Sequence, residues 1–139
     1  MKYLCLVYVE EKKLRALSKS ARAALAADAL AYDDALRKSG HYIVSSALQP
    51  LQNATTLQTR NGRLSITDGT VAQTSGQLSG FILISAKDLN DALHVAAKIP
   101  PGRIGRIEVR PVAELERPHA VDQPGCATQS SDRFQPQRA

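Results

Sequence analysis

The sequence predicts a mixed α+β domain with a ferredoxin-like split β-α-β order and a hairpin inserted in its middle. Two nearly continuous apolar runs, residues 3–9 and 81–85, have the pattern of strands that are buried on both faces. A segment with helical spacing of apolar residues follows each run. Between the two halves lies Asn61-Gly62, which is the strongest short signal for a hairpin turn. The resulting element order is β-α-β-β-β-α-β.

The first half of the chain contains the longer predicted helix. The first strand ends at the charged residues 10–13, and Ser18 or Ser20 can cap the helix that follows. Gly40 suits the left-handed position just past the helix end. Its apolar face is formed by Ala21, Leu25, Ala29, Tyr32 and Leu36, which recur at spacings of three and four residues.

The middle of the chain predicts three more strands. Residues 41–48 are rich in β-forming side chains and stop at Pro50. Residues 54–60 alternate in polarity, and residues 63–67 return after the turn. A polar segment, residues 67–80, follows and is bracketed by two turn signals, Asp68-Gly69 and Ser79-Gly80.

The last part of the chain predicts a strand, a helix and an edge strand. Asp88 can cap the helix, whose expected apolar face is Leu89, Ala92, Leu93 and Ala96. Pro100-Pro101 ends this helix. Residues 104–112 alternate between apolar and charged side chains, which indicates an edge strand with one wet face.

Two helices can cover only one face of the predicted sheet. Because the inner strands are apolar on both faces, we expect a second copy of the chain to cover the other face, in a homodimer with its sheets face to face. The predicted domain spans residues 1–116. Residues 117–139 are rich in Gln, Ser and Pro and predict a flexible tail.

Composition excludes several classes of protein. The net charge is +5, from 18 Lys and Arg against 13 Asp and Glu, but the cations are scattered and aromatic content is only 4%, so no nucleic-acid partner is expected. Cys5 and Cys126 form no disulfide framework, and three dispersed histidines predict no metal site. No phosphate-binding loop or other cofactor motif is present, so no cofactor is expected. The apolar runs are too short for a signal peptide or membrane span, which favours a cytoplasmic protein.

Four segments together resemble the YCII-related, DGPF-domain proteins over residues 1–116. They are MKYLCLVYVEE, SGHYIVSSALQP, ATTLQTRNGRLSITDG and QLSGFILISAKDLNDALHVAAKIPPGRIGRIEVRPV. The resemblance implies a dimeric α+β barrel. It also implies relatives of two kinds: small enzymes that act on aromatic or lactone compounds, and accessory proteins encoded near extracytoplasmic-function sigma factors.

The signature stretch of that family departs from its usual form in this chain. The family has a stretch like DGPFAETKEQLGGF, whereas this chain has DGTVAQTSGQLSGF. Thr70 and Val71 replace Pro-Phe, Gln73 and Gly76 replace glutamates, and Ser75 replaces lysine. If the family uses those glutamates for acid–base work, this chain should be impaired in it.

Asp68 and His41 are the candidate catalytic residues. Asp68 follows a strand and precedes a glycine, so its carboxylate could point into a cleft, and His41 could pair with it as a general base. The alternatives are structural. An Asp in an Asp-Gly turn commonly binds its own backbone N–H groups, and a lone histidine at a strand start is commonly an exposed surface residue.

Five further residues are candidates for binding a ligand. They lie at strand ends or in the polar segment: Tyr8, Thr67, Gly69, Thr74 and Gln77. A few hydrogen-bonding groups on apolar walls are the usual composition of a small-molecule site. Ordinary strand-end polarity and, for Gly69, backbone geometry are the alternatives.

Two functions are consistent with these features. One is a protein that binds a small molecule between the sheet and residues 67–80, as a binder or as a weak or lapsed enzyme. The other is a dimerisation or regulatory module, with a sigma factor as the expected partner. An RNA-recognition interpretation ranks last, because Leu57, Thr59, Ile82 and Leu83 stand where aromatic residues would be required.

Overall fold

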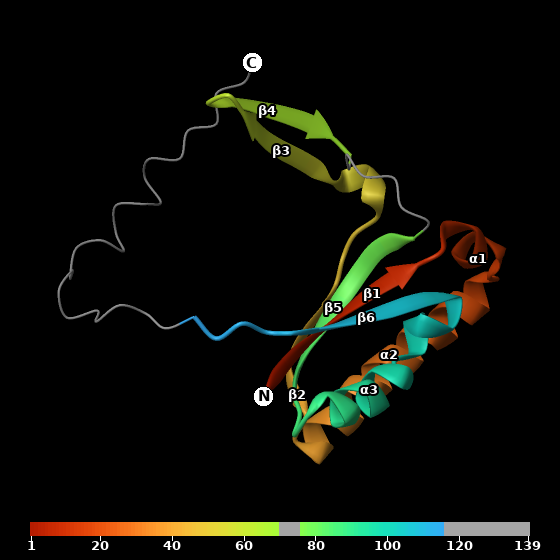
Figure 1. Ribbon diagram of the computed structural model, residues 1–139. Coiled ribbons are helices and arrows are strands. Elements are labelled where there is room, and N and C mark those ends of the chain that lie inside the picture. The colour runs from red at the N-terminus through yellow and green to blue at the C-terminus, as the bar shows by residue number, and fades with distance from the viewer. Residues whose placement is uncertain (70–75, 116–139) are drawn as a thin grey trace.

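A computed structural model of the chain describes residues 1–69 and 76–115. Four antiparallel strands form the main sheet in the order β2-β5-β1-β6 (Figure 1). Their bounds are β1 Lys2–Val9, β2 Tyr42–Ala47, β5 Gln77–Ser85 and β6 Gly105–Pro111. This arrangement confirms the ferredoxin-like split order that the sequence predicts, with β6 at one edge as expected.

Helices α2 (Lys19–Ser39) and α3 (Leu89–Ala97) lie on one face of the sheet (Figure 1). The predicted caps are confirmed. The Ser18 hydroxyl accepts a hydrogen bond from the backbone N–H of Ala21 at 3.1 Å, and the Asp88 carboxylate accepts one from Asp91 at 2.9 Å. Gly40 follows α2 with φ of 84°, a left-handed conformation that favours glycine.

The core lies between the helices and the sheet. From β1 it takes every second residue, Tyr3, Cys5, Val7 and Val9, and from β5 and the helical layer Ile82, Ile84, Leu36, Ala92, Val95, Ala96 and Ile99. The Tyr32 hydroxyl of α2 donates to the Val95 carbonyl of α3 at 2.6 Å, which ties the two helices together. Burial raises the pKa of the Cys5 thiol to about 11, because the thiolate would lose its hydration there.

The other side of the sheet, here called the open face, has no helix over it. Strand pairing places Leu4, Leu6 and Tyr8 of β1 on this face, opposite Leu83, Phe81 and Leu78 of β5 and opposite Arg110, Glu108 and Arg106 of β6. Val44 of β2 adjoins Leu83 there and is 44% exposed. Within one chain, β1 and β5 are therefore buried on one face and half-buried on the other.

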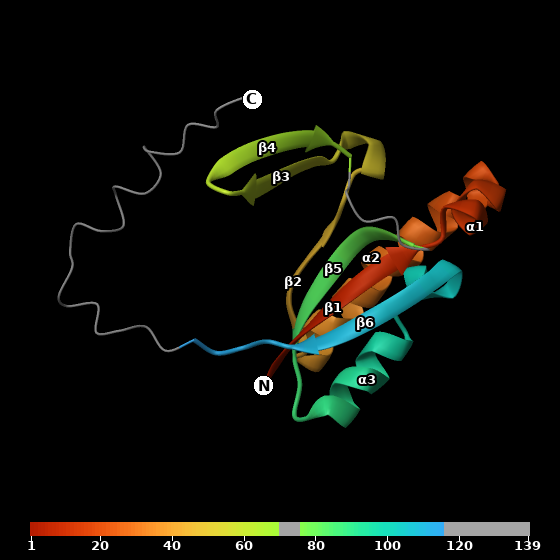
Figure 2. The same cartoon turned by 45° about the horizontal axis from the view of Figure 1, so that its top comes forward.

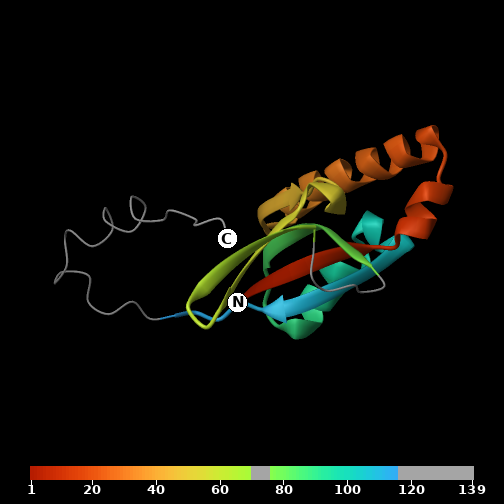
Figure 3. The ribbon, with the colours of Figure 1, turned by 90° about the horizontal axis from the view of Figure 1, so that it is seen from above.

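The inserted hairpin forms a sheet of its own. Strands β3 (Thr55–Arg60) and β4 (Arg63–Asp68) pair across the predicted turn, with positive φ at Asn61 and Gly62. Figures 1 and 2 show this hairpin set off from the four-stranded sheet, on the side away from α2 and α3. Seen from above, it lies across one end of that sheet (Figure 3). A short 3-10 helix, η1 (Leu51–Asn53), precedes it.

One predicted boundary is wrong. Ser79-Gly80 is no turn, because β5 begins at Gln77 and runs through both residues. Gly80 lies so close to the neighbouring strand that a Cβ there would come within 2.8 Å of the Ser46 carbonyl oxygen. The glycine thus allows a close strand approach, and the register shift beside it, between Val7 and Tyr8, marks the same irregularity.

Two helical details also differ from expectation. Residues expected only to end the first strand form a short helix, α1 (Glu11–Ala16), in which Arg15 pairs with Glu11 one turn away. On α3, Leu89 and Leu93 are 49% and 45% exposed, and Val95 is buried instead. The proline pair follows the end of α3, as expected, and forms the start of the 3-10 helix η2 (Pro100–Ile104), which leads into β6.

Candidate functional site

The end of the open face nearest the hairpin carries a stacked cation and ring. The guanidinium carbon of Arg106 lies 4.4 Å from the centre of the Tyr8 ring. The two residues are direct partners in the β1–β6 register. Next to them, Gln77 opens β5 opposite Val9. Because Val9 belongs to the core on the helix side, this pairing puts the Gln77 side chain on that side as well. We call Tyr8 and Arg106 the Tyr8–Arg106 site.

Gly76, just before β5, approaches this site closely. A Cβ on Gly76 would lie 3.0 Å from a terminal guanidinium nitrogen of Arg106 and 3.4 Å from the Tyr8 Cβ. Gly76 therefore lies close against the cation–ring pair. Such a stack holds the planar guanidinium in a fixed orientation and leaves hydrogen-bond donors at its rim.

Sequence reasoning identified Tyr8 but missed Arg106. The alternation of β6 indicated that Arg106 faces water, together with Glu108 and Arg110. The sequence did not show the register of β1 with β6. In that register Arg106 lies opposite Tyr8, whereas Glu108 and Arg110 lie opposite leucines.

Two further ligand-binding candidates, Thr67 and Gly69, lie at the end of the hairpin. Thr67 and Asp68 end β4, opposite Thr56 and Thr55, and both are exposed. Gly69 has φ of 85° and its N–H donates to the Ala54 carbonyl at 2.7 Å, so backbone geometry accounts for this glycine. Thr74 lies outside the described residues.

The structure pairs His41 with Asp91 and not with Asp68. Its Nε2 lies 3.1 Å from Oδ2 of Asp91, at the start of α3, while Nδ1 lies 2.7 Å from the Ser39 hydroxyl at the end of α2. His41 precedes β2 and the hairpin follows it, so the strand length of about 20 Å keeps His41 away from the hairpin end of the sheet. The predicted His41–Asp68 pair is therefore wrong.

The Ser39, His41 and Asp91 chain has the residue types of a nucleophile, a base and an orienting carboxylate. However, the Ser39 hydroxyl also lies 3.1 Å from the Leu36 carbonyl, to which it donates at the helix end. A hydroxyl has one proton, so that bond and donation to His41 compete. We interpret the three residues as a structural hydrogen-bond network that joins α2, β2 and α3.

Asp91 is held in its charged form. The backbone N–H of Lys87, which donates to Oδ2 at 3.0 Å, is the main reason that the pKa of Asp91 lies below its ordinary value, and His41 acts in the same direction. The sequence showed Asp91 as part of a helix start. Its contact with His41, fifty residues earlier, had no sequence signal.

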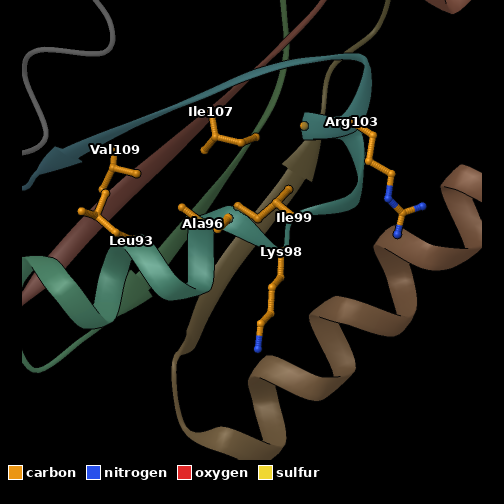
Figure 4. A pocket seen from close by; sticks show the side chains of 9 residues that line it. Leu93, Ala96, Lys98, Ile99, Arg103, Ile107 and Val109 are labelled. Carbon is orange, nitrogen blue, oxygen red and sulfur yellow. The ribbon is translucent and has the colours of Figure 1, made fainter.

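A groove of about 660 Å³ lies on the opposite side of the sheet, between α3, η2 and β6. Figure 4 shows its apolar wall, formed by Leu93, Ala96, Ile99, Ile107 and Val109, with Lys98 and Arg103 pointing toward α2. Arg103 makes an ion pair with Asp28 of α2 at 3.0 Å. The groove was not predicted, because it follows from the exposure of Leu93 beside the edge strand.

Two classes of feature are absent from the described part of the chain. Residues 1–69 and 76–115 contain no group of three or more side chains that could hold a metal ion. None of the helices in those ranges is long and apolar enough to cross a membrane.

Comparisons with known proteins include a family match, a similar curated protein and a similar solved structure. The model of the YCII-related domain matches residues 1–116. An uncharacterized protein of Rhizobium meliloti (strain 1021) is 32% identical over 115 residues, which is 81% of this chain and 93% of the relative. The chain is also similar to the solved structure of a 5-chloro-2-hydroxyhydroquinone dehydrochlorinase from Burkholderia phenoliruptrix AC1100 in complex with 2,5-dihydroxybenzoquinone. That similarity has 16% identity and a TM-score of 0.48, and covers 83% of this chain and 96% of the other.

Proposed function

Because the chain belongs to the family of YCII-related domains, we propose that it is a small-molecule-binding protein whose ligand occupies the Tyr8–Arg106 site. The observation that carries this proposal is the guanidinium of Arg106 stacked 4.4 Å from the Tyr8 ring, at the end of an apolar sheet face. The site combines a fixed cation, an aromatic surface and a phenolic hydroxyl, which is a usual composition for recognising small molecules.

The chemistry of the site favours an aromatic or otherwise apolar acid. A guanidinium presents donors in a planar fork that matches a carboxylate, and stacking on Tyr8 holds that fork in place. Leu6 and Phe81 pair with each other on the next row of the open face and offer an apolar surface for the rest of such a ligand. The Tyr8 hydroxyl can fix its orientation.

A homodimer would enclose this site. The open face has a row of apolar side chains, Leu4, Leu6, Phe81, Leu83 and Val44, next to the charged row of β6. Packing this face on the same face of a second copy would remove the apolar row from water. It would also lower the dielectric constant around Arg106, which strengthens its attraction for an anion.

A titration with benzoate and benzamide tests the proposal, because the two probes differ mainly in charge. We expect benzoate to shift the backbone NMR signals of Tyr8, Gln77 and Arg106, and benzamide to bind more weakly. Arg106→Gln should weaken benzoate binding about tenfold or more, the effect of losing a charge-assisted hydrogen bond, without changing benzamide binding.

Arg110→Gln is the matched control. Arg110 lies on the same face of the same strand but opposite Leu4, so this variant loses the same charge without touching the Tyr8 ring. Equal loss of benzoate binding in both variants would contradict a specific site and indicate general attraction to the basic strand. Shifts concentrated on Leu93, Lys98 and Arg103 would instead assign the ligand to the groove beside α3.

A further inference from the structure

Gly76 is a buried residue that faces the Tyr8–Arg106 site from the start of β5. A Cβ added to it would meet a terminal guanidinium nitrogen of Arg106 first, at 3.0 Å, and the Tyr8 Cβ next, at 3.4 Å. The Cα–Cβ direction at this position therefore points at the cation. Any side chain at position 76 would begin beside the guanidinium.

Two common reasons for a glycine do not apply to Gly76. Positive φ, which favours glycine, occurs at three other described glycines and not here. A close approach of backbones requires Gly80, where an added Cβ would come within 2.8 Å of the Ser46 carbonyl oxygen. At Gly76 the nearest atom is the end of the flexible Arg106 side chain, so a larger residue fits after a small shift of the guanidinium.

Among the described residues, no carboxylate forms an ion pair with Arg106. Glu108 is on the same face of β6 but two residues along the strand, where the Cα atoms are roughly 7 Å apart. Gly76 also replaces a glutamate of the stretch DGPFAETKEQLGGF, which this segment resembles. A position that points at the guanidinium therefore carries no acidic side chain.

From these observations we propose that Gly76 is the specificity-determining residue of the Tyr8–Arg106 site. Because position 76 supplies no carboxylate, the site keeps the positive charge of Arg106 and selects an anionic ligand. The inference rests on the proposed function and names the residue that sets the charge of its ligand. A carboxylate at position 76 would pair with the guanidinium and compete with a ligand carboxylate for the same donors.

Titrations of two variants with benzoate and benzamide test the inference. Gly76→Glu and Gly76→Gln add side chains of nearly the same size, but only Gly76→Glu adds a charge. We expect Gly76→Glu to bind benzoate about tenfold or more weakly than Gly76→Gln, because benzoate must displace the internal carboxylate. The two variants should bind the neutral benzamide equally. In an Arg106→Gln background, the difference in benzoate binding should disappear.

The outcomes distinguish this inference from the proposed function. If the wild type binds benzoate and the two variants bind it equally, the charge at position 76 has no role, and the Tyr8–Arg106 site stands without it. A benzoate difference that persists in the Arg106→Gln background would also overturn the inference, because the added charge would then act from a distance. A wild type that does not prefer benzoate to benzamide would overturn the proposed function and the inference together.

A second measurement needs no ligand. The pKa of the carboxylate introduced by Gly76→Glu is followed by NMR as the pH is varied. Pairing with Arg106 favours the ionised form, so we expect this pKa to lie below the ordinary glutamate value of about 4.3 and to rise when Arg106→Gln is added. The same pKa in both backgrounds would overturn the inference. Circular dichroism checks folding, and if Gly76→Glu does not fold, Gly76→Asp with Gly76→Asn as its control makes the same comparisons with a shorter side chain.

Discussion

The two faces of the central strands have the same kind of side chain but different surroundings. Ile84 is completely buried under the helices, while its neighbour Leu83 points to the open face and is half-buried. Cys5 and Leu6 show the same contrast on β1. A continuous apolar run therefore indicates that both faces avoid water, but it does not tell which part of the molecule, or which molecule, covers each of them.

Alanine substitutions at the adjacent residues Ile84 and Leu83 test this contrast, and we expect from them the largest change in the free energy of unfolding. Ile84→Ala should lower the free energy of unfolding by about 3 kcal/mol, because it removes a fully buried side chain and leaves a cavity. Leu83→Ala should cost about 1 kcal/mol in dilute protein, since this side chain is only partly buried there. Urea unfolding at two protein concentrations measures both.

The concentration dependence separates the two faces. If a second copy covers the open face, the cost of Leu83→Ala should grow with protein concentration, whereas the cost of Ile84→Ala should stay the same. A cost of Leu83→Ala that is independent of concentration would contradict association through this face.

Local sequence patterns were enough to predict most of the fold. Periodicity, the caps at Ser18 and Asp88, and the Asn61-Gly62 turn placed the main helices and strands in their order. They failed at Ser79-Gly80, where a dipeptide typical of turns serves a close approach between strands. Turn chemistry is a local property, and the position of the neighbouring strand is not.

The candidate site was predicted less completely than the fold. Tyr8 was identified because it marks the end of a central strand, which the sequence shows. Arg106 joins it only through strand register, and His41 meets Asp91 only because α3 packs beside the start of β2. Both contacts link residues that are distant in sequence, and a single sequence has no pattern that pairs them.

A second prediction concerns the thiol of Cys5, which lies on the sheet face that the helices cover. Because the pKa of Cys5 is raised to about 11 from 9.0, folding favours the neutral thiol, and its contribution to stability is complete below pH 9 and lost as the pH rises to about 11. The full loss is about 3 kcal/mol. Urea unfolding at pH 8 and pH 10.5 should show most of this decrease.

Cys5→Val is the control for this pH dependence, because valine is similar in size and has no proton to lose. Tyr32, whose pKa burial also raises, with a smaller contribution from Cys5, titrates in both proteins. The difference between the two proteins therefore reports the thiol together with its smaller effect on Tyr32. An identical alkaline decrease in wild type and Cys5→Val would show that Cys5 is not shielded from water.

The smallest expected effect comes from the Ser39–His41–Asp91 hydrogen-bond network, which joins α2, β2 and α3. Asp91→Asn removes the charge that accepts from His41 and from the Lys87 N–H, so we expect a small loss of stability at pH 7, less than the alkaline loss at Cys5. Since the pKa of Asp91 is lowered from 3.8, its contribution is present above that pH and disappears as the pH falls below it. The stability of the wild type relative to Asp91→Asn should therefore decrease between pH 5 and pH 3.

Asp34→Asn is the control, because it removes a carboxylate that pairs with Arg37 within α2. We expect its stability to differ less from the wild type at both pH values. An advantage that persists unchanged at pH 3 would mean that the side-chain shape of Asp91, and not its charge, joins α3 to β2.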